Sequence, residues 1–320
     1  MPRATRREFI AVAAVGAALR PTLAASMPEG AKRSWTMDLA PGAIGIEGDQ
    51  RHVIELAARH GFESVAPAGD KLGALSDGEL ADLLGLMKDK GLVWGAGGLP
   101  VDFRRDDETF RKTSAGLTDY VKGLRRAGVT RVGTWILPCS DTYTYRQYFD
   151  TIAKRLQPTA RILRDEGVRL GLEYVGPRTS LVSCKYPFLH TLAETAELIE
   201  AIGVPGVGYV LDSWHWFLAE DTVEQIRALR NEDVVAVDLN DAPAGIPREE
   251  QMDLSRELPA ATGIIPVRDF LSALQAIGYD GPVRAEPFNK KLNEMDDDAA
   301  AAATAAALGK AFALLSPPEP

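Results

Sequence analysis

Short apolar segments alternate with amphipathic segments of helical length from residue 35 to the end of the chain. Eight apolar segments are predicted to be strands, over residues 35–39, 62–67, 92–99, 129–138, 168–176, 207–212, 233–241 and 281–288. Each is followed by a stretch with helical periodicity. Strands joined by helices lie parallel, and eight such units close into a barrel. The pattern therefore predicts a single (β/α)8 TIM barrel over residues 33–316, a fold that often uses about 250 residues as one domain.

The first 26 residues differ in composition from the rest of the chain. Arg6 and Arg7 precede an apolar run of ten residues, and small residues follow up to Ser26. This layout predicts a twin-arginine signal peptide over residues 1–26, and the alternative is a frayed amphipathic helix. The apolar run is too short to cross a bilayer, and no later segment is long and apolar enough to do so. We therefore expect a periplasmic protein without membrane contact after signal cleavage.

The net charge and the two cysteines limit the kinds of partner that the protein can have and the bonds that it can form. The formal net charge is -9, and no stripe of lysine and arginine is interleaved with aromatic residues. A nucleic-acid partner is therefore excluded, and a small neutral or metal-bound substrate is expected, with a homo-oligomer compatible with the sequence. The two cysteines, Cys139 and Cys184, follow neighbouring predicted strands. A disulfide between them and two free thiols both remain open.

Carboxylates lie near the ends of four consecutive predicted strands. Glu173 belongs to the fifth strand, Asp212 ends the sixth, Asp238 and Asp241 belong to the seventh, and Glu286 belongs to the eighth. In a TIM barrel the carboxyl ends of all strands meet at the catalytic face. We therefore expect these acids to share one pocket.

Several carboxylates buried together need a compensating charge. Burying one unpaired carboxylate costs several kcal/mol, and a divalent cation among the group removes that cost. Each acid alone also has a simpler interpretation. An aspartate at a strand end often caps the next helix, and a buried glutamate can pair with an arginine, here Arg284 or Arg178.

Asp212 is followed by the segment SWHW, which places His215 three residues further on. We expect the turn to return His215 to the same pocket, where a neutral imidazole can exchange a proton near neutral pH. Trp214 is expected to form a pocket wall, because apolar faces of sugar rings stack on indoles. The alternative is a histidine packed between the indoles of Trp214 and Trp216.

A long connection follows the seventh predicted strand. Residues 242–265 contain three prolines and several charges. Loops of this length in compact domains usually have a function, and in a barrel this one emerges on the catalytic face. We interpret it as a lid or substrate-contact loop. Arg256 on this loop is a candidate to orient a substrate hydroxyl or carboxylate, or it forms a surface salt bridge. Lys185 is a further candidate for substrate binding.

The segments GLEYVG, LDSWHW, VDLNDAP and RAEPF, together with LPVDFR and GYDGPV, resemble the xylose isomerase-like TIM-barrel family. The resemblance covers nearly the whole chain after the signal peptide. This family includes sugar isomerases and epimerases, inosose dehydratases and, more distantly, endonuclease IV. The resemblance implies that Glu173 and Glu286 bind a metal ion and also move the proton. It further implies that Asp212 is a metal ligand and that His215 contacts the substrate.

The chain departs from the family pattern at the seventh strand, where Asp238 stands in place of a histidine. A cage of carboxylates with Asp238 as fourth ligand favours Mn2+ or Mg2+, with Co2+ and Zn2+ as alternatives. Asn240 lies on the same strand face and is a fallback ligand or substrate contact. Endonuclease IV relatives use several histidines, whereas this chain has four, two of them in the first predicted helix. DNA repair is therefore disfavoured.

These residues predict a divalent-metal-dependent sugar isomerase or epimerase that acts through an enediolate. One alternative is a lyase or dehydratase that eliminates a group from an oxidised sugar, such as a 3-keto-glycoside, at the same site. Another is a non-catalytic periplasmic sugar-binding barrel. The sugar, the choice between isomerase and lyase, the metal and the oligomeric state do not follow from the sequence.

Overall fold

The structure is a computed structural model that describes residues 33–315. The predicted signal peptide over residues 1–26 lies outside the described residues, and so does residue 316 at the predicted end of the barrel. Among the described residues, no helix has the length and apolar character that a membrane span requires.

The strands form one curled parallel sheet. Its order is β3-β2-β1-β11-β10-β9-β7-β5-β4. The two end strands, β3 and β4, both come from the predicted strand 92–99, so the sheet closes on itself within one chain segment. The strand bounds are β1 (Thr36–Leu39), β2 (Ser64–Val65), β3 (Val93–Trp94), β4 (Gly97–Gly98), β5 (Arg131–Trp135), β6 (Cys139–Ser140), β7 (Arg169–Glu173), β8 (Tyr186–Pro187), β9 (Val207–Asp212), β10 (Val234–Leu239) and β11 (Pro282–Ala285).

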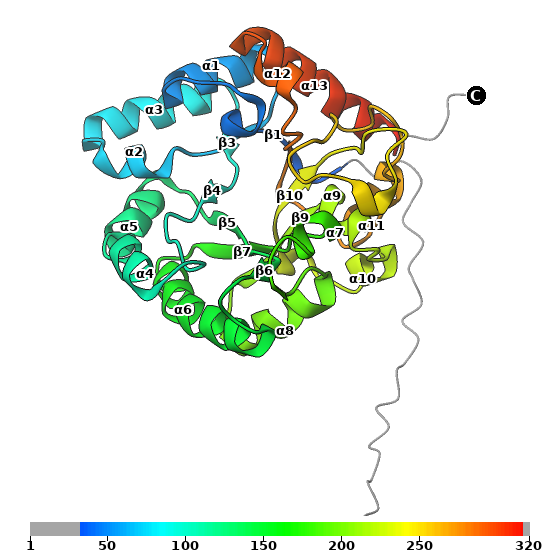
Figure 1. Cartoon of the computed structure of the whole chain (residues 1–320). Coiled ribbons are helices and arrows are strands. Elements are labelled where there is room, and N and C mark those ends of the chain that lie inside the picture. The colour runs from blue at the N-terminus through cyan, green and yellow to red at the C-terminus, as the bar shows by residue number, and fades with distance from the viewer. Residues whose placement is uncertain (1–32, 316–320) are drawn as a thin grey trace, which may run out of the picture. The chain divides into compact units, whose positions relative to one another are not determined.

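The helices form a ring outside the strands (Figure 1). Their bounds are α1 (Gln50–Arg59), α2 (Gly69–Ala74), α3 (Asp77–Asp89), α4 (Asp107–Ser114), α5 (Leu117–Ala127), α6 (Tyr145–Asp165), α7 (Arg178–Leu181), α8 (Leu192–Ile202), α9 (Ser213–Leu218), α10 (Val223–Arg227), α11 (Val267–Ala276), α12 (Lys290–Asn293) and α13 (Asp297–Ala313). Short 3-10 helices are η1 (Pro41–Ile44), η2 (Asn231–Asp233) and η3 (Arg248–Glu250). The predicted single TIM barrel is confirmed.

Local signals explain most helix boundaries. Ser76 accepts a hydrogen bond from the backbone N–H of Glu79 and forms a capping box at the start of α3. Residues 107–127 form two helices, α4 and α5, which are separated at Gly116. Glycine is among the least favourable residues in a helix interior, which accounts for the break.

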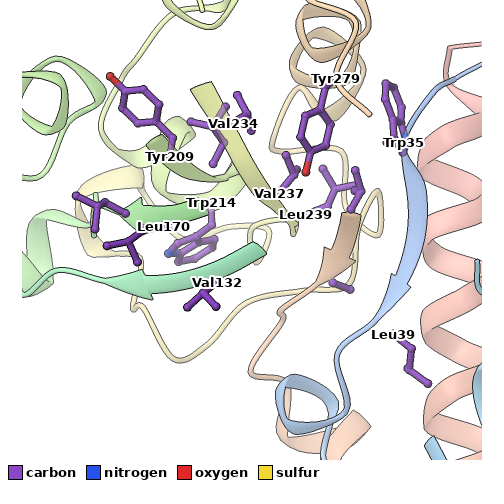
Figure 2. Close-up of a cluster of buried hydrophobic side chains, with 14 of the residues drawn as sticks. Trp35, Leu39, Val132, Leu170, Tyr209, Trp214, Val234, Val237, Leu239 and Tyr279 are labelled. Atoms are coloured by element: carbon purple, nitrogen blue, oxygen red, sulfur yellow. The ribbon is translucent and has the colours of Figure 1, made fainter. Parts of the chain in front are cut away.

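The hydrophobic core fills the space inside the barrel and between the sheet and the helices. Figure 2 shows part of it, with Trp35, Val237 and Tyr279 among the labelled side chains. Each of these three is at most 2% exposed. Fully burying an apolar side chain stabilises a fold by roughly 1.5–3 kcal/mol. The packing is close enough that a Cβ added to Gly171 would lie 2.7 Å from a methyl group of Val210. Glycine is therefore required at that position of β7.

Cys139 and Cys184, whose pairing remained open from the sequence, form a disulfide with their Cα atoms 5.5 Å apart. The bond connects β6 to the segment just before β8, and β6 and β8 pair as antiparallel strands. These segments follow β5 and β7 on the catalytic face of the barrel. The disulfide therefore ties two loops of the catalytic face together.

Removing the disulfide with Cys139→Ser and Cys184→Ser is expected to lower the free energy of unfolding by roughly 2–4 kcal/mol, because the bond shortens the unfolded chain across 45 residues. Urea denaturation of the double variant and of the wild-type protein measures the difference. Wild-type protein unfolded in the presence of a reductant should match the double variant. Equal midpoints for the oxidised wild type and the double variant would contradict the prediction.

Candidate active site

Four acids are positioned at the carboxyl ends of neighbouring strands. Glu173 is the last residue of β7, Asp212 is the last residue of β9, and Glu286 directly follows β11. Asp238 of β10 is in register with Asp212 on one side and with Arg284 of β11 on the other. Register partners in a parallel sheet present their side chains to the same face. The register therefore places Asp212, Asp238 and Arg284 at one level of the barrel.

The acids converge within coordination reach of one another. Oxygen atoms of Glu173, Asp238 and Glu286 all lie within 4.8 Å of each other. Atoms of Glu173, Asp212 and His215 form a second group with the same spacing. Glu173 belongs to both groups and is therefore the centre of the cluster. The structure thus brings four of the strand-end acids into two overlapping groups, whereas Asp241 belongs to neither group, and of these acids Glu173 and Glu286 line the cavity described below.

Arg256 from the long loop after β10 enters this cluster. Its Nη1 atom donates to Asp212 Oδ2 at 2.7 Å and to Glu286 Oε2 at 3.3 Å, and its Nη2 atom donates to Asp253 Oδ1 at 2.8 Å. The side chain is 2% exposed, which excludes the alternative of a surface salt bridge. Burial by itself lowers the pKa of Arg256, but Asp212 and Glu286 outweigh this effect and raise it above its usual value. Arg256 therefore stays charged.

A second arginine, Arg284, pairs with Asp238. Its Nε and Nη2 atoms donate to the two carboxylate oxygens at 2.5 and 3.0 Å. The alternative that Arg284 pairs with Glu173 or Glu286 is thus corrected, because the register of β10 and β11 puts Asp238 beside it. Arg178 is exposed at the start of α7 and does not line the cavity described below. The charge of Asp238 is already compensated within the protein.

The cluster keeps an excess of negative charge. If all groups ionise, five carboxylates, with Asp253 included, and two guanidinium groups leave three negative charges. Burial, followed by the Glu286 carboxylate, raises the pKa of Glu173 well above its usual range. Burial, followed by the Asp238 carboxylate, raises the pKa of Glu286 to about 8. The Oε1 atom of Glu173 is buried and has no hydrogen-bond partner among the described residues. Oxygen ligands with this charge fit one divalent cation.

Asp212 has the cap role that the sequence offered as an alternative to a metal ligand, and its second carboxylate oxygen faces the cluster. It is the N-cap of α9, where its Oδ1 atom accepts a hydrogen bond from the Trp214 backbone N–H at 2.8 Å. The same oxygen accepts from Asn240 Nδ2 at 2.9 Å. Burial raises the pKa of Asp212 to about 6, and Arg256 opposes this shift. The cap orients the carboxylate so that Oδ2 faces the cluster.

His215 lies in the cluster and is 2% exposed. Its Nδ1 atom accepts a hydrogen bond from the Gly176 backbone N–H at 3.2 Å. Burial, supported by the charge of Arg256, lowers the pKa of His215 well below its usual value. A neutral imidazole whose Nδ1 is an acceptor carries its proton on Nε2. The Nε2 atom lies 3.8 Å from Asp212 Oδ2 and 3.4 Å from Arg256 Nη2, so it faces both the acids and the arginine.

Asn240 and Asp241 hold the site together. The Asn240 side chain donates to Asp212 and accepts from the Glu286 backbone N–H at 3.1 Å, so its amide is used within the protein. This corrects its expected role as a substrate contact. Asp241 accepts backbone N–H bonds from Ala242, Thr262, Gly263 and Ile265, at both ends of the long loop. Asp241 therefore anchors the loop that carries Arg256.

A cavity of about 480 Å³ opens beside the acids. Trp214 is fully buried in the core and Trp216 is 5% exposed, so neither forms the expected pocket wall. Trp214 instead packs behind Arg256, with the guanidinium carbon 5.5 Å from its ring centre. Lys185 is exposed and also does not line the cavity. Both expectations are corrected, because side-chain direction on α9 and before β8 depends on packing against distant segments.

Sequence reasoning missed several residues of the cavity wall. Among them are Trp135 at the end of β5, Leu254 on the long loop and Phe288 after β11. Trp135 ends a strand as the acids do, so its position is a signal that could have identified it. Leu254 and Phe288 carry no comparable signal.

The chain matches known proteins over most of its length. The family described as xylose isomerase-like TIM barrel matches residues 54–311. An inosose isomerase from Bacillus velezensis is 25% identical over 76% of this chain and 84% of that protein. A D-psicose 3-epimerase from Ruminiclostridium cellulolyticum is 23% identical over 76% of this chain and 79% of that protein. The solved structure of a xylose isomerase domain protein from Alicyclobacillus acidocaldarius is 30% identical, with a TM-score of 0.76, covering 87% of this chain and 98% of that one. The chain belongs to the xylose isomerase-like TIM barrel family.

Proposed function

We propose that the protein is a divalent-metal-dependent enzyme that isomerises or epimerises a sugar. The observation that supports this most directly is the cluster of four converging carboxylates, which two arginines compensate only in part. The similarity to an inosose isomerase and a D-psicose 3-epimerase agrees with a carbohydrate substrate. The metal ion is proposed to be Mn2+ or Mg2+, because oxygen ligands suit hard cations.

Glu173, Asp212 and Glu286 would hold the cation. Asp238 stays a predicted fourth ligand, although Arg284 already occupies both of its oxygens. A bound dication would stabilise the negative charge that develops on neighbouring sugar oxygens when a C–H proton leaves. The Oε1 atom of Glu173 has no hydrogen-bond partner among the described residues, so a bound cation would remove the cost of burying it.

The proton is moved by Glu173 and Glu286 in this proposal. Both carboxyl groups have raised pKa values, and that of Glu286, about 8, allows this group to exist in either protonation state near neutral pH. General acids and bases work best when their pKa lies near the working pH. One carboxylate takes the α-proton, which gives the enediolate. The other returns a proton to the adjacent carbon or to the opposite face, which gives the isomer or the epimer.

His215 and Arg256 would position the substrate. The Nε2–H group of His215 can donate to a sugar oxygen, and its pKa keeps the ring neutral, so it does not compete for the proton. Arg256 holds the carboxylates of Asp212 and Glu286 in place through its hydrogen bonds. Arg256 therefore fixes the positions of the two acids relative to each other, because the same Nη1 atom donates to both.

The apolar wall of the cavity favours one second candidate, a lyase. If a leaving group is β to the carbonyl, the electrons of the broken C–H bond expel it, and a carboxyl group returns the proton to the departing oxygen. An oxidised glycoside would react in this way, and its aglycone would occupy the apolar wall. Release of a free aglycone with an unsaturated or hydrated sugar distinguishes this reaction from isomerisation.

We also propose that the enzyme works in the periplasm after removal of residues 1–26. The disulfide between Cys139 and Cys184 supports this, since such bonds persist in oxidising compartments. N-terminal sequencing of the protein from a periplasmic extract tests the proposal. A cytosolic protein that still carries Arg6 and Arg7 would overturn it.

Removal of the metal tests the proposed function. Chelation is expected to lower exchange of the substrate α-proton with solvent deuterium at least about 10²-fold, in line with the contribution of charge stabilisation to such steps. Added Mn2+ should restore the exchange. The measurement is NMR of a panel of ketoses and 3-keto-glycosides in D2O, with elemental analysis of the protein before and after chelation. A protein that is free of metal by elemental analysis and exchanges at the original rate would refute metal dependence.

A further inference from the structure

Part of the wall of the cavity beside the acids is apolar, and we call this part its apolar end. Its wall there is formed by Trp135, Leu137, Val175, Leu254 and Phe288. Trp135 is 45% exposed and Leu254 is 71% exposed, although tryptophan and leucine usually lie inside a folded chain. Exposed apolar groups that line a cavity next to a reactive centre commonly mark a binding site. The acids do not explain why these apolar side chains are exposed at the cavity.

Two of the aromatic side chains are held in place at some cost. The Arg104 guanidinium lies 4.4 Å from the ring centre of Trp135, and it donates to the Trp135 backbone oxygen at 2.9 Å. Phe288 has a φ of 42°, a backbone conformation that bulky residues rarely adopt. The Arg256 guanidinium lies 4.8 Å from its ring centre. Strain of this kind is retained mainly at functional positions.

The size and polarity of the cavity exclude a free monosaccharide as its full occupant. A volume of about 480 Å³ is in the range of roughly 300–1,000 Å³ that is typical of pockets for drug-sized ligands. A free hexose carries a hydroxyl on almost every carbon. Besides the residues of the acid cluster, the wall offers the side chains of Ser180, Ser183 and Asp253; the Ser183 hydroxyl already donates to the Ser180 backbone oxygen at 2.7 Å, and Asp253 accepts from Arg256 at 2.8 Å. The apolar end cannot satisfy a second set of sugar hydroxyls.

We propose that this end is a subsite for an apolar, ring-shaped substituent of the substrate, so that the enzyme acts on an aryl-substituted sugar. The inference rests on the proposed function, because it takes the acids as the sugar-binding end of the same cavity. The sugar lies at Glu173, Glu286 and His215, and the substituent lies between Trp135 and Leu254.

Calorimetric titration of the full-length, metal-loaded protein with phenyl and methyl β-D-glucopyranoside tests the subsite. Neither probe has a carbonyl group, so turnover does not interfere. The phenyl glucoside is expected to bind at least about tenfold more tightly, as burial of an aromatic ring predicts. Trp135→Ala and Leu254→Ala should each remove most of this preference and leave the affinity for the methyl glucoside unchanged.

Val93→Ala is the matched control, because Val93 is 53% exposed and does not line the cavity. It should keep the full preference. Leu254 lies on the surface of the long loop, so its variant stays informative even if Trp135→Ala fails to fold. Equal affinity of the wild type for both probes, no binding of the phenyl glucoside, or an unchanged preference in Leu254→Ala would overturn the subsite.

The outcomes for the subsite and for the proposed function are separable. A phenyl preference without any deuterium exchange in keto sugars supports the subsite and removes the isomerase. Deuterium exchange without a phenyl preference supports the isomerase and removes the subsite.

Discussion

Replacing Glu173 with glutamine is expected to slow exchange of the substrate α-proton by roughly 10²–10⁴-fold, which is the usual contribution of a general acid or base. Glutamine has nearly the same shape and cannot carry the proton. Glu173 is the residue common to both groups of potential ligands, and burial strongly disfavours its charge. The substitution therefore removes the reactive carboxylate and also relieves an unfavourable buried charge. We expect the midpoint of thermal unfolding of the metal-free variant to equal or exceed that of the metal-free wild type.

The measurement is deuterium exchange by NMR together with elemental analysis of the variant. Metal analysis separates a lost ligand from a lost base, because a variant that still binds metal and does not exchange has lost the base. Glu224→Gln is the control, since Glu224 is exposed and pairs with Arg227 on α10. It should exchange at the wild-type rate. A Glu173→Gln protein within about tenfold of the wild-type rate would show that Glu173 is no acid or base, given the contribution of such groups.

Asp238→Ala is expected to lower the free energy of unfolding by roughly 3–5 kcal/mol, because it leaves the Arg284 guanidinium buried without its partner. Both Asp238 oxygens accept hydrogen bonds from Arg284, and the Asp238 side chain is 0% exposed. Replacing both partners is expected to cost less than replacing one. The double variant Asp238→Ala with Arg284→Met should therefore recover much of the loss.

Urea denaturation of the two single variants and the double variant measures the coupling. If the double variant is as unstable as Asp238→Ala alone, the loss of stability is not caused by the unpaired Arg284 guanidinium. Two further variants examine the predicted ligand role of Asp238. Because Arg284 binds both oxygens of Asp238, whereas Asp212 shares Arg256 with Glu286 and Asp253, we expect Asp238→Asn to weaken Mn2+ binding less than Asp212→Asn does. The reverse order would establish Asp238 as the stronger ligand.

Much of the fold and the reactive part of the site could be predicted from local sequence. Apolar segments of strand length separated by helical stretches define the barrel, because each pattern buries one face of its element. Glu173, Asp212 and Glu286 were found by their positions at strand ends, which a parallel barrel brings together at one face. His215 followed from its spacing to Asp212, since a short turn returns the third residue to the same place.

The partners of these residues could not be predicted in the same way. Arg284 was considered as a partner of the glutamates, and the register of β10 and β11 assigns it to Asp238. Trp214 was expected in the pocket wall and instead packs in the core, whereas Trp135 lines the cavity. The direction of each side chain depends on neighbours that are far away in sequence. Residue type and local spacing contain no information on them.

The sequence by itself determined the barrel and the convergence of acids, since both follow from hydrogen bonding and burial along continuous segments. Only the tertiary structure decided how the charge is balanced. Arg256 is 44 residues from Asp212 and reaches it because Asp241 fastens the long loop at both ends. The apolar end of the cavity likewise joins segments from β5, the long loop and the end of β11. Such contacts form when the chain closes on itself, so their energies depend on distances that no local pattern specifies.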